Sequence, residues 1–370
     1  MERGQVKKNW GNRPWKVEFS PAKQELPKTV DFAVVGGGFT GLSAAARLKQ
    51  FSPESSVCLL EATEFGAGSS GHTGGMALAE SAAGDLPGLG DVLTGYQKVL
   101  QELDVQGDMT FPGVYELGRT FPLPNSPICW KDSGELRAVK EVSGGTINPG
   151  KVVSGFARAA EGLGVQLFER SGVEGTRFAE RVELQTRRGP VHAKKALFAT
   201  NAYSLELSGL HGLAEAMFTL AVATQPLTDA AIADLGLSER KPFYTVDLPY
   251  LWGRMLGNAV IFGSGLVHMD DWRELDELDI DGGEAASMFA RLETRIRGLH
   301  PSLANVSFTH RWGGPICIAE QWKPVFGWHP ESRNTIVLGA YSGHGVAQSV
   351  YLGSWAAEVM LERRALPNWR

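Results

Sequence analysis

Cysteine is scarce in this 370-residue chain, which contains only Cys58, Cys129 and Cys317. Their number is odd and their spacing is unlike that of metal ligands, which argues against a disulfide scaffold or a metal site and favours a reducing compartment. The first residues, MERGQVKKNWGNRPW, lack the apolar core of a signal peptide, and no long uncharged apolar run follows. We therefore expect a cytoplasmic protein without a metal and without a membrane partner.

Neither sign of charge is in strong excess. The formal net charge is -5, with 21% charged and 43% hydrophobic residues, as in an ordinary globular protein. A basic surface for a polyanion is not indicated, so we expect no nucleic-acid partner. Internal repeats and low-complexity segments are also absent, and the length allows roughly two domains.

The most informative stretch begins with the apolar run Val30 to Val35. Gly36, Gly38 and Gly41 follow at once in G-x-G-x-x-G spacing, and a helical pattern comes after them. A second apolar run ends in Glu61, twenty positions beyond the last glycine. Strand, glycine turn, helix, second strand and acid in this order predict a dinucleotide-binding unit.

Each part of this pattern has a physical task. Gly36 permits a tight turn, Gly38 lets a pyrophosphate approach the backbone, and Gly41 lets the helix pack closely on the strand. The helix amino terminus offers free N–H groups to phosphates, and Glu61 would accept hydrogen bonds from a ribose hydroxyl. A flexible loop is the alternative for glycines alone, and this motif by itself does not separate FAD from NAD.

The remaining patterns predict an α/β fold in which a Rossmann-like domain is built from discontinuous segments. We assign 1–28 to an extended arm anchored by Trp10 and Trp15, and 29–95, 146–212 and 326–370 to the nucleotide-binding domain. A mostly antiparallel β-sheet substrate domain takes 96–145 and 213–325. We further expect a loop over 68–76, a strand pair broken by Pro112, and helices over 285–299 and 346–363.

Several motifs, in order, resemble the D-amino-acid-oxidase-like family of FAD-dependent oxidoreductases. They are VVGGGFTGLSAAARL, LLEATEFGAGSSGHTGG, INPGKVV, ALFATNAY, RWGG and GAYSGHGV. The resemblance extends from residue 29 to about residue 362. The family includes glycine and sarcosine oxidases, and the sequence looks most similar to its γ-glutamylputrescine oxidoreductase branch. The resemblance implies an extended FAD whose ring lies beside 68–76, with a helix amino terminus after 341–345 aimed at the ring.

The motif and the resemblance together give the candidate cofactor-binding residues. They are Gly36, Gly38, Phe39, Thr40, Gly41, Glu61, Ala62, Gly68, Ser69, Ser70, His72, Thr73, Gly74, Gly75, Met76, Val173, Thr200, Asn201, Ala202, Trp312, Gly314, Gly343, Gly345 and Val346. In dimethylglycine and sarcosine dehydrogenases a histidine in a similar loop carries the flavin covalently, so His72 either holds FAD in this way or only hydrogen-bonds within its loop. We interpret Cys317 as a core cysteine.

The candidate catalytic residues are Arg254, Tyr341, His344, Trp252 and Arg311. Aromatic side chains would disfavour the charged form of an amine by desolvation, and Tyr250, Trp252, Trp312 and Tyr341 are the candidates. Arg254, or else Arg311, would meet a substrate carboxylate, although either is equally well a surface arginine. His344 would touch substrate or cap its helix. The segment Val260 to Gly263 lacks the lysine that sarcosine oxidases place over the ring, which leaves oxygen use open.

The resulting hypothesis is an FAD-dependent amine or amino-acid oxidase or dehydrogenase. It would oxidise a C–N bond by hydride transfer to the flavin, giving an imine that hydrolyses, with O2 or another acceptor taking the electrons. An FAD-dependent 2-hydroxy acid dehydrogenase with His344 as base is one alternative. A flavin-binding assembly protein without turnover is the other, and the intact glycines at both flavin turns argue against it.

Overall fold

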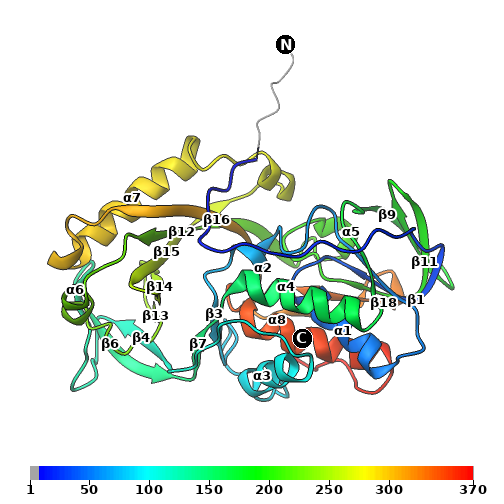
Figure 1. Cartoon of the computed structure of the whole chain (residues 1–370), viewed down its shortest axis with the longest axis horizontal. Coiled ribbons are helices and arrows are strands. Elements are labelled where there is room, and N and C mark those ends of the chain that lie inside the picture. The colour runs from blue at the N-terminus through cyan, green and yellow to red at the C-terminus, as the bar shows by residue number, and fades with distance from the viewer. Residues whose placement is uncertain (1–7, 370) are drawn as a thin grey trace, which may run out of the picture.

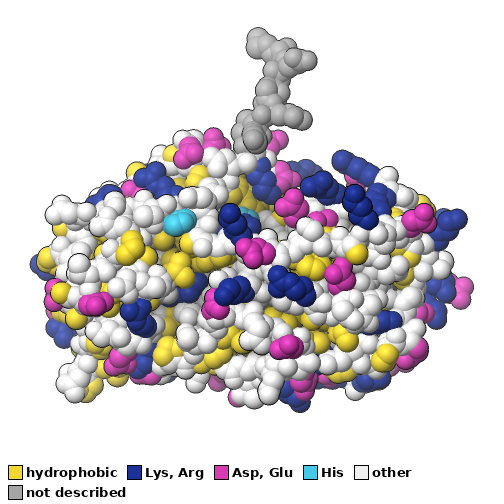
Figure 2. Space-filling model, viewed as in Figure 1, with side chains coloured by type: hydrophobic (Ala, Val, Ile, Leu, Met, Phe, Trp, Pro, Cys, Tyr) yellow, Lys and Arg dark blue, Asp and Glu magenta, His cyan; other side chains and the backbone are white. Residues whose placement is uncertain are grey.

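The structure, a computed structural model, describes residues 8–369 and builds them around two eight-stranded β-sheets. Figure 1 shows the first sheet on the right, with helices in front of it and below it, and the second on the left, with β16 (Phe308–Ala319) reaching across the top. Among the described residues no helix is long and apolar enough to cross a lipid bilayer. Acidic and basic side chains are interspersed over the face shown in Figure 2.

The first sheet is largely parallel. Its spatial order is β17 (Val325–His329), β18 (Ser332–Gly339), β11 (Gly189–Phe198), β1 (Thr29–Val35), β2 (Val57–Leu60) and β8 (Gln166–Phe168), and β9 (Val173–Phe178) and β10 (Val182–Thr186) form a hairpin on β11. The strands from β18 to β8 are parallel neighbours. Since both faces of such a sheet are covered, adjacent residues such as Ala33 and Val34 are both fully buried.

One face of this sheet is covered by α1 (Phe39–Phe51), α3 (Val92–Glu102), α4 (Pro149–Gly162) and α8 (Gly345–Met360) (Figure 1). Local sequence fixes where two of these helices begin. The Asp91 carboxylate accepts a hydrogen bond from the backbone N–H of Thr94 at 2.9 Å, and the Asn148 side chain caps α4, whose first residue is Pro149.

The second sheet is mostly antiparallel. Its order is β16 (Phe308–Ala319), β12 (Ala214–Thr224), β15 (Ala259–His268), β14 (Trp252–Leu256), β13 (Phe243–Thr245), β4 (Val114–Gly118), β6 (Glu135–Val142) and β5 (Cys129–Lys131), with β4 and β13 parallel. Its apolar core packs with α5 (Leu205–Ser208), α6 (Asp229–Asp234), α7 (Gly283–Leu299) and the 3-10 turns η1 (Trp272–Asp276) and η2 (Pro301–Leu303). A small separate sheet pairs β3 (Met76–Leu78) with β7 (Gly144–Thr146).

The mixed α/β architecture expected from the sequence is confirmed, while two local predictions are wrong. The stretch around Pro112 forms one strand, β4, which starts only at Val114 because proline cannot donate to a ladder. The expected loop over 68–76 contains one helical turn, α2 (Ser69–His72), and ends in the first residue of β3. The domain limits given above stay a prediction.

The described part of the amino-terminal arm, residues 8–28, is extended and connects the two sheets (Figure 1). Gly11 bridges to Trp312 of β16, and the Trp10 indole donates a hydrogen bond to the carbonyl of Leu275. The Trp15 indole donates to the carbonyl of Gly71 in α2 at 2.8 Å. Both tryptophans are 5% exposed, so the arm is part of the folded body.

Helices α1 and α8 touch backbone to backbone. A Cβ atom added at Gly353 of α8 would lie 2.5 Å from the carbonyl oxygen of Thr40 in α1. Within α1, a Cβ at Gly41 would lie 1.9 Å from the carbonyl oxygen of Gly36. Glycine at these two positions is therefore needed for the close approach of α1 to the preceding turn and to α8.

We predict that Gly353→Ala lowers the free energy of unfolding by about 2 kcal/mol, because the added methyl group overpacks the contact between α1 and α8. Chemical denaturation measures this loss. Gly162→Ala at the end of α4 is the matched control, since its Cβ would meet nothing within 4 Å. Equal midpoints for the two variants would contradict the prediction.

Candidate active site

A cavity of about 1520 Å³ lies between the two sheets. Its walls come from the turn between β1 and α1, the end of β2, α2, the segment after β11 and the turn between β18 and α8. Strands β4, β12, β13, β14, β15 and β16 of the second sheet complete them. The carboxyl ends of parallel strands thus meet the face of an antiparallel sheet. Among the described residues no group of side chains has the composition of a metal site.

The turn before α1 is shaped by glycine and by two side-chain acceptors. Gly36 has φ +108, a backbone conformation that favours glycine. The N–H of Gly37 donates to the Glu61 carboxylate at 2.7 Å, and the N–H of Phe39 donates to the Ser70 hydroxyl at 2.9 Å. Burial raises the pKa of the Glu61 carboxyl, against hydrogen bonds from Thr63 and Gly37. Glu61 is thus held at the mouth of the glycine turn.

The turn before α8 lies next to the turn before α1. The hydroxyls of Tyr341 and Thr40 are 2.8 Å apart, and Gly343 has φ +92. His344 is the last residue before α8, and its side chain makes no capping hydrogen bond. Two helix amino termini therefore face one cavity, and their positive ends favour bound negative charge there.

The helical turn α2 is fixed by the arm and by the second sheet. The Trp312 indole donates to the carbonyl of His72 at 2.9 Å, and the Asn201 amide donates to the Ser69 hydroxyl at 3.0 Å. The ring nitrogens of His72 lie 2.5 Å from Arg13 Nη1 and 2.9 Å from the carbonyl oxygen of Gly68. Burial first, and then the charge of Arg13, lowers the pKa of His72 to about 3.

The far end of the cavity is aromatic and acidic. The Trp252 indole covers Gly74 and Gly263, where an added Cβ would lie 2.1 Å from its ring. Tyr244 of β13 places its hydroxyl oxygen 2.9 Å from a carboxylate oxygen of Glu80 and 2.9 Å from one of Glu116. The charged side chains at this end are thus carboxylates.

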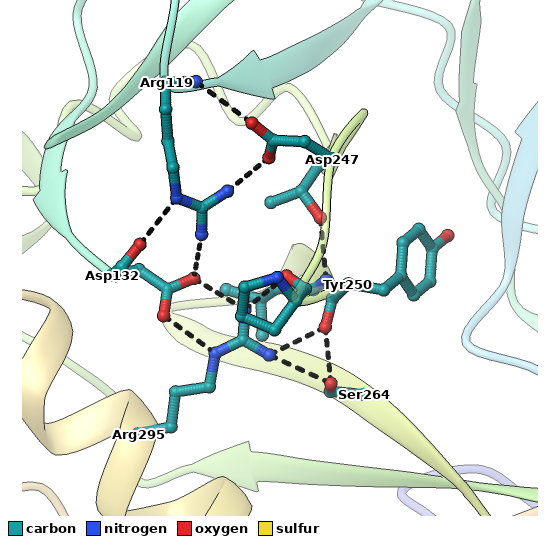
Figure 3. A network of polar contacts seen from close by, with 9 residues as sticks. Arg119, Asp132, Asp247, Tyr250, Ser264 and Arg295 are labelled. Carbon is teal, nitrogen blue, oxygen red and sulfur yellow. Dashed lines mark hydrogen bonds and ion pairs between the residues drawn. The ribbon is translucent and has the colours of Figure 1, made fainter. Parts of the chain in front are cut away.

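A polar network holds the segment 246–250 at the rim of the cavity (Figure 3). The Asp132 side chain, 5% exposed, accepts hydrogen bonds from Arg295 at 2.6 and 3.0 Å and from Arg119 at 3.1 Å. Arg295 also donates to the carbonyls of Pro249 and Tyr250, both at 2.7 Å. In Figure 3 the Tyr250 ring points away from this network.

Most of the residues predicted from the sequence lie on the cavity wall. They are Gly36, Gly38, Phe39, Thr40, Glu61, Ala62, Gly68, Ser69, Ser70, His72, Thr73, Gly74, Met76, Val173, Thr200, Asn201, Trp252, Trp312, Gly314, Tyr341, Gly343, His344, Gly345 and Val346. Gly41, Gly75 and Ala202 lie behind it. Cys317 also lines the cavity, although it is 1% exposed.

Neither predicted carboxylate-binding arginine lines the cavity. Arg311 is half exposed and forms an ion pair with Glu293 on the outer side of the sheet. Arg254 is buried behind the loop, where its Nε donates to the carbonyl of Gly74 at 2.5 Å and its guanidinium lies over Trp15. Burial lowers the pKa of Arg254 to about 10, so it is still charged at neutral pH.

Sequence reasoning missed Glu80, Glu116, Tyr244 and Ser349, all of which line the cavity. The first had a detectable signal, an acid four residues after Met76, which ends the loop assigned to the cofactor. The others lie in ordinary strand and helix patterns, and only the fold brings them to one place.

This cavity fits a large, anionic, partly polar ligand. Two helix amino termini face it, and the hydroxyls of Thr200 and Ser349 line it without a hydrogen-bond partner among residues 8–369. A glycine turn at the end of a strand, an acid at the end of the next strand and a covering sheet are together typical of a dinucleotide-binding site.

The chain belongs to the FAD dependent oxidoreductase family DAO, whose model matches residues 31–359. Among curated relatives it is 27% identical to γ-glutamylputrescine oxidoreductase of Escherichia coli, over 90% of this chain and 84% of that protein. It is 25% identical to the probable oxidoreductase OrdL of Haemophilus influenzae, over 90% of this chain and 83% of that protein. The resemblance inferred from the motifs is therefore confirmed.

Solved structures agree on the fold. Glycine oxidase from Geobacillus kaustophilus superimposes with a TM-score of 0.71 at 18% identity, covering 92% of this chain and 96% of that one. L-Amino acid deaminase from Proteus myxofaciens gives 0.72 at 13% identity, covering 97% and 95%. The protein is an FAD-dependent oxidoreductase, which confirms the cofactor predicted from the sequence.

We predict that Asp132→Asn lowers the free energy of unfolding by about 3 kcal/mol, because it leaves the largely buried Arg295 without its carboxylate and Arg119 with Asp247 alone. Asp108→Asn, which breaks the exposed ion pair with Lys151, is the control and should cost less than about 1 kcal/mol. Chemical denaturation of both variants at one pH compares them. A loss no larger than the control's would contradict the role of the network.

We also predict a pH dependence from His72. Its pKa is lowered on folding, so the stability that its neutral form contributes is present above the unfolded value of about 6.5 and is lost as the pH falls towards 3. Between pH 7 and pH 5 this loss amounts to about 2 kcal/mol. Thermal unfolding of His72→Gln should show a weaker pH dependence, whereas the exposed His211→Gln should match the parent.

Proposed function

We propose that this oxidoreductase oxidises the C–N bond of an amine. The observation that carries the proposal is the arrangement of the cavity: three cofactor-type segments meet at one end, and the other end is walled by Trp252 and Tyr244 with no arginine on the described wall. The names of several relatives refer to amine or amino-acid substrates, namely γ-glutamylputrescine, 4-methylaminobutanoate and glycine.

The residues that would hold FAD follow from the cavity. The N–H groups of the turn at Gly36–Gly38 would meet the pyrophosphate, and Glu61 the adenosine ribose. The turn at Gly343–Gly345 would place the positive end of α8 near the ring. When bound, FAD supplies a two-electron acceptor for the C–H bond next to nitrogen, so that the amine becomes an imine, which water hydrolyses.

The residues at the far end would prepare the amine. The Trp252 indole excludes water from the part of the wall that it covers, which favours the neutral amine that this chemistry requires. Burial lowers the pKa of His344, against a hydrogen bond to the Ser342 carbonyl and the charge of Glu80. His344 is then uncharged at neutral pH and can accept the proton that an incoming ammonium must release.

We further propose that FAD is held without a covalent bond to His72. Both ring nitrogens of His72 already lie at hydrogen-bond distance from Arg13 and the Gly68 carbonyl, so attachment of the flavin would displace one of these partners. Flavin that precipitates with the acid-denatured polypeptide would contradict this.

Anaerobic mixing of the holoenzyme with amines, N-methyl amino acids, polyamine derivatives and 2-hydroxy acids tests the proposed reaction. We expect loss of the oxidised-flavin absorbance with at least one amine and none with hydroxy acids. Bleaching by hydroxy acids alone would identify an alcohol dehydrogenase with His344 as the base. A flavin reduced by dithionite yet by no compound of the panel would favour an assembly protein without turnover.

A further inference from the structure

The charged side chains on the cavity wall are unevenly distributed. Lys8 is the single lysine or arginine among the described residues that line the cavity. Its ammonium lies 3.2 Å from the carboxylate of Asp276, which lines the same cavity, so the two charges largely cancel. Glu61 is held in the cofactor turn by the N–H groups of Gly37 and Thr63. Two carboxylates, Glu80 and Glu116, are left at the substrate end.

These two carboxylates come from different elements and share one phenol. Glu80 follows β3, Glu116 lies in β4, and Tyr244 lies in β13 between them. The Tyr244 hydroxyl oxygen is 2.9 Å from each carboxylate, but one hydroxyl hydrogen can be donated to only one of them. The other carboxylate therefore receives no hydrogen bond from Tyr244.

No nearby cation among residues 8–369 fully compensates this charge. Lys140 is the closest partner, 3.8 Å from a Glu116 oxygen, but it is mostly exposed, and such a pair contributes little in water. Glu116 itself is 9% exposed. A buried carboxylate requires a charged or hydrogen-bonding partner, and here the open cavity is the place where a partner can bind.

An independent feature of the same wall points to a hydrogen-bond donor from a ligand. Gln348 of α8 donates to the backbone carbonyl of Glu80 at 3.0 Å and so fixes that segment against α8. The next residue, Ser349, is 5% exposed and lines the cavity, and its hydroxyl has no hydrogen-bond partner within residues 8–369. A buried hydroxyl in this state is a ready acceptor or donor for a polar ligand atom.

From these contacts we infer that Glu80 and Glu116, positioned by Tyr244, bind a second positive charge of the substrate, remote from the C–N bond that is oxidised. The substrate class is then a diamine or another amine that carries a remote ammonium. This inference rests on the proposed function and adds the residues that select the substrate. An ammonium brings three donors, enough for both carboxylates at once.

The same arrangement disfavours a substrate with a carboxylate at that position. A carboxylate placed beside Glu80 and Glu116 would meet like charge with little water to screen it. Arg254 and Arg311, which could pair with a substrate carboxylate, do not line the cavity. We therefore expect this cavity to prefer substrates with a remote ammonium over substrates with a remote carboxylate.

The test uses sets of three compounds of equal chain length, covering three to eight methylene groups. Each set contains a diamine, the monoamine in which a methyl group replaces the remote ammonium, and the amino acid in which a carboxylate replaces it. Calorimetric titration of the dithionite-reduced holoenzyme measures binding without turnover. We expect one or more diamines to bind at least about ten-fold more tightly than the matched monoamine, with the amino acid weakest.

Variants assign the effect to the two carboxylates. Glu80→Gln and Glu116→Gln should each weaken binding of the preferred diamine about ten-fold or more, and binding of the matched monoamine less than about two-fold. The matched control is Glu141→Gln, on neighbouring β6, which removes a carboxylate that pairs with Lys241 outside the cavity. Flavin content of each variant shows whether the site is intact.

The inference is overturned if no diamine binds more tightly than its monoamine, or if the glutamine variants weaken all three compounds equally, as a purely structural role would. These outcomes are separate from failure of the proposed reaction. If no amine reduces the oxidised flavin, the proposed function fails, whereas a failed inference leaves flavin reduction by amines in place and removes only the preference for a remote ammonium.

Discussion

The packing of α8 against α1 is the contact on which the rest of the structure depends. Gly353 lets the two helices approach until its Cα region meets the Thr40 carbonyl, and the hydroxyls of Thr40 and Tyr341 then lie 2.8 Å apart. The amino-terminal turns of both helices consequently open into the same cavity, although some 300 residues separate them in the chain. Two positive helix ends at one place favour bound negative charge at that end of the cavity.

The second sheet gives the other end the opposite character. Its strands bring Tyr244, Glu116 and Trp252 to the wall, and β3 brings Glu80. One cavity thus carries positive helix ends along the part where FAD would lie, and carboxylates at the end where the proposed amine would bind. Such a gradient of potential would orient the anionic FAD and, under the proposed function, a cationic amine, because each would be repelled from the other's position.

Much of this was predictable from the sequence where the signal is local. The glycine turn, Glu61 and the turn before α8 are short motifs whose spacing follows from backbone geometry, and they lie on the cavity wall as expected. The prediction that Arg311 binds a substrate carboxylate ignored the alternation of side chains along a strand. Arg311 is adjacent to Trp312 on β16, and neighbouring strand residues point to opposite faces, so placing Trp312 in the cavity already excludes Arg311.

Glu80, Glu116 and Tyr244 could not be grouped from the sequence, because they lie on three segments that meet only through the pairing of β4 with β13 and the position of β3. Arg254 illustrates the same limit in another way. It is two residues from Trp252 on β14 and shares its side of the strand, yet Gly74 and Gly75 lie over its guanidinium. Strand periodicity predicts the face of the sheet to which a side chain points, but it does not show which loop covers that face.

The amino-terminal arm has a consequence for the order of assembly. Residues 9 to 18 are synthesised before the elements that they bind, namely α2, α4, η1 and β16, and the contact between Asn12 and Arg311 spans 299 residues. The arm can therefore dock only after the late strands of the second sheet have emerged. Until then the side of α2 that Trp10 and Trp15 contact, which includes His72, is uncovered.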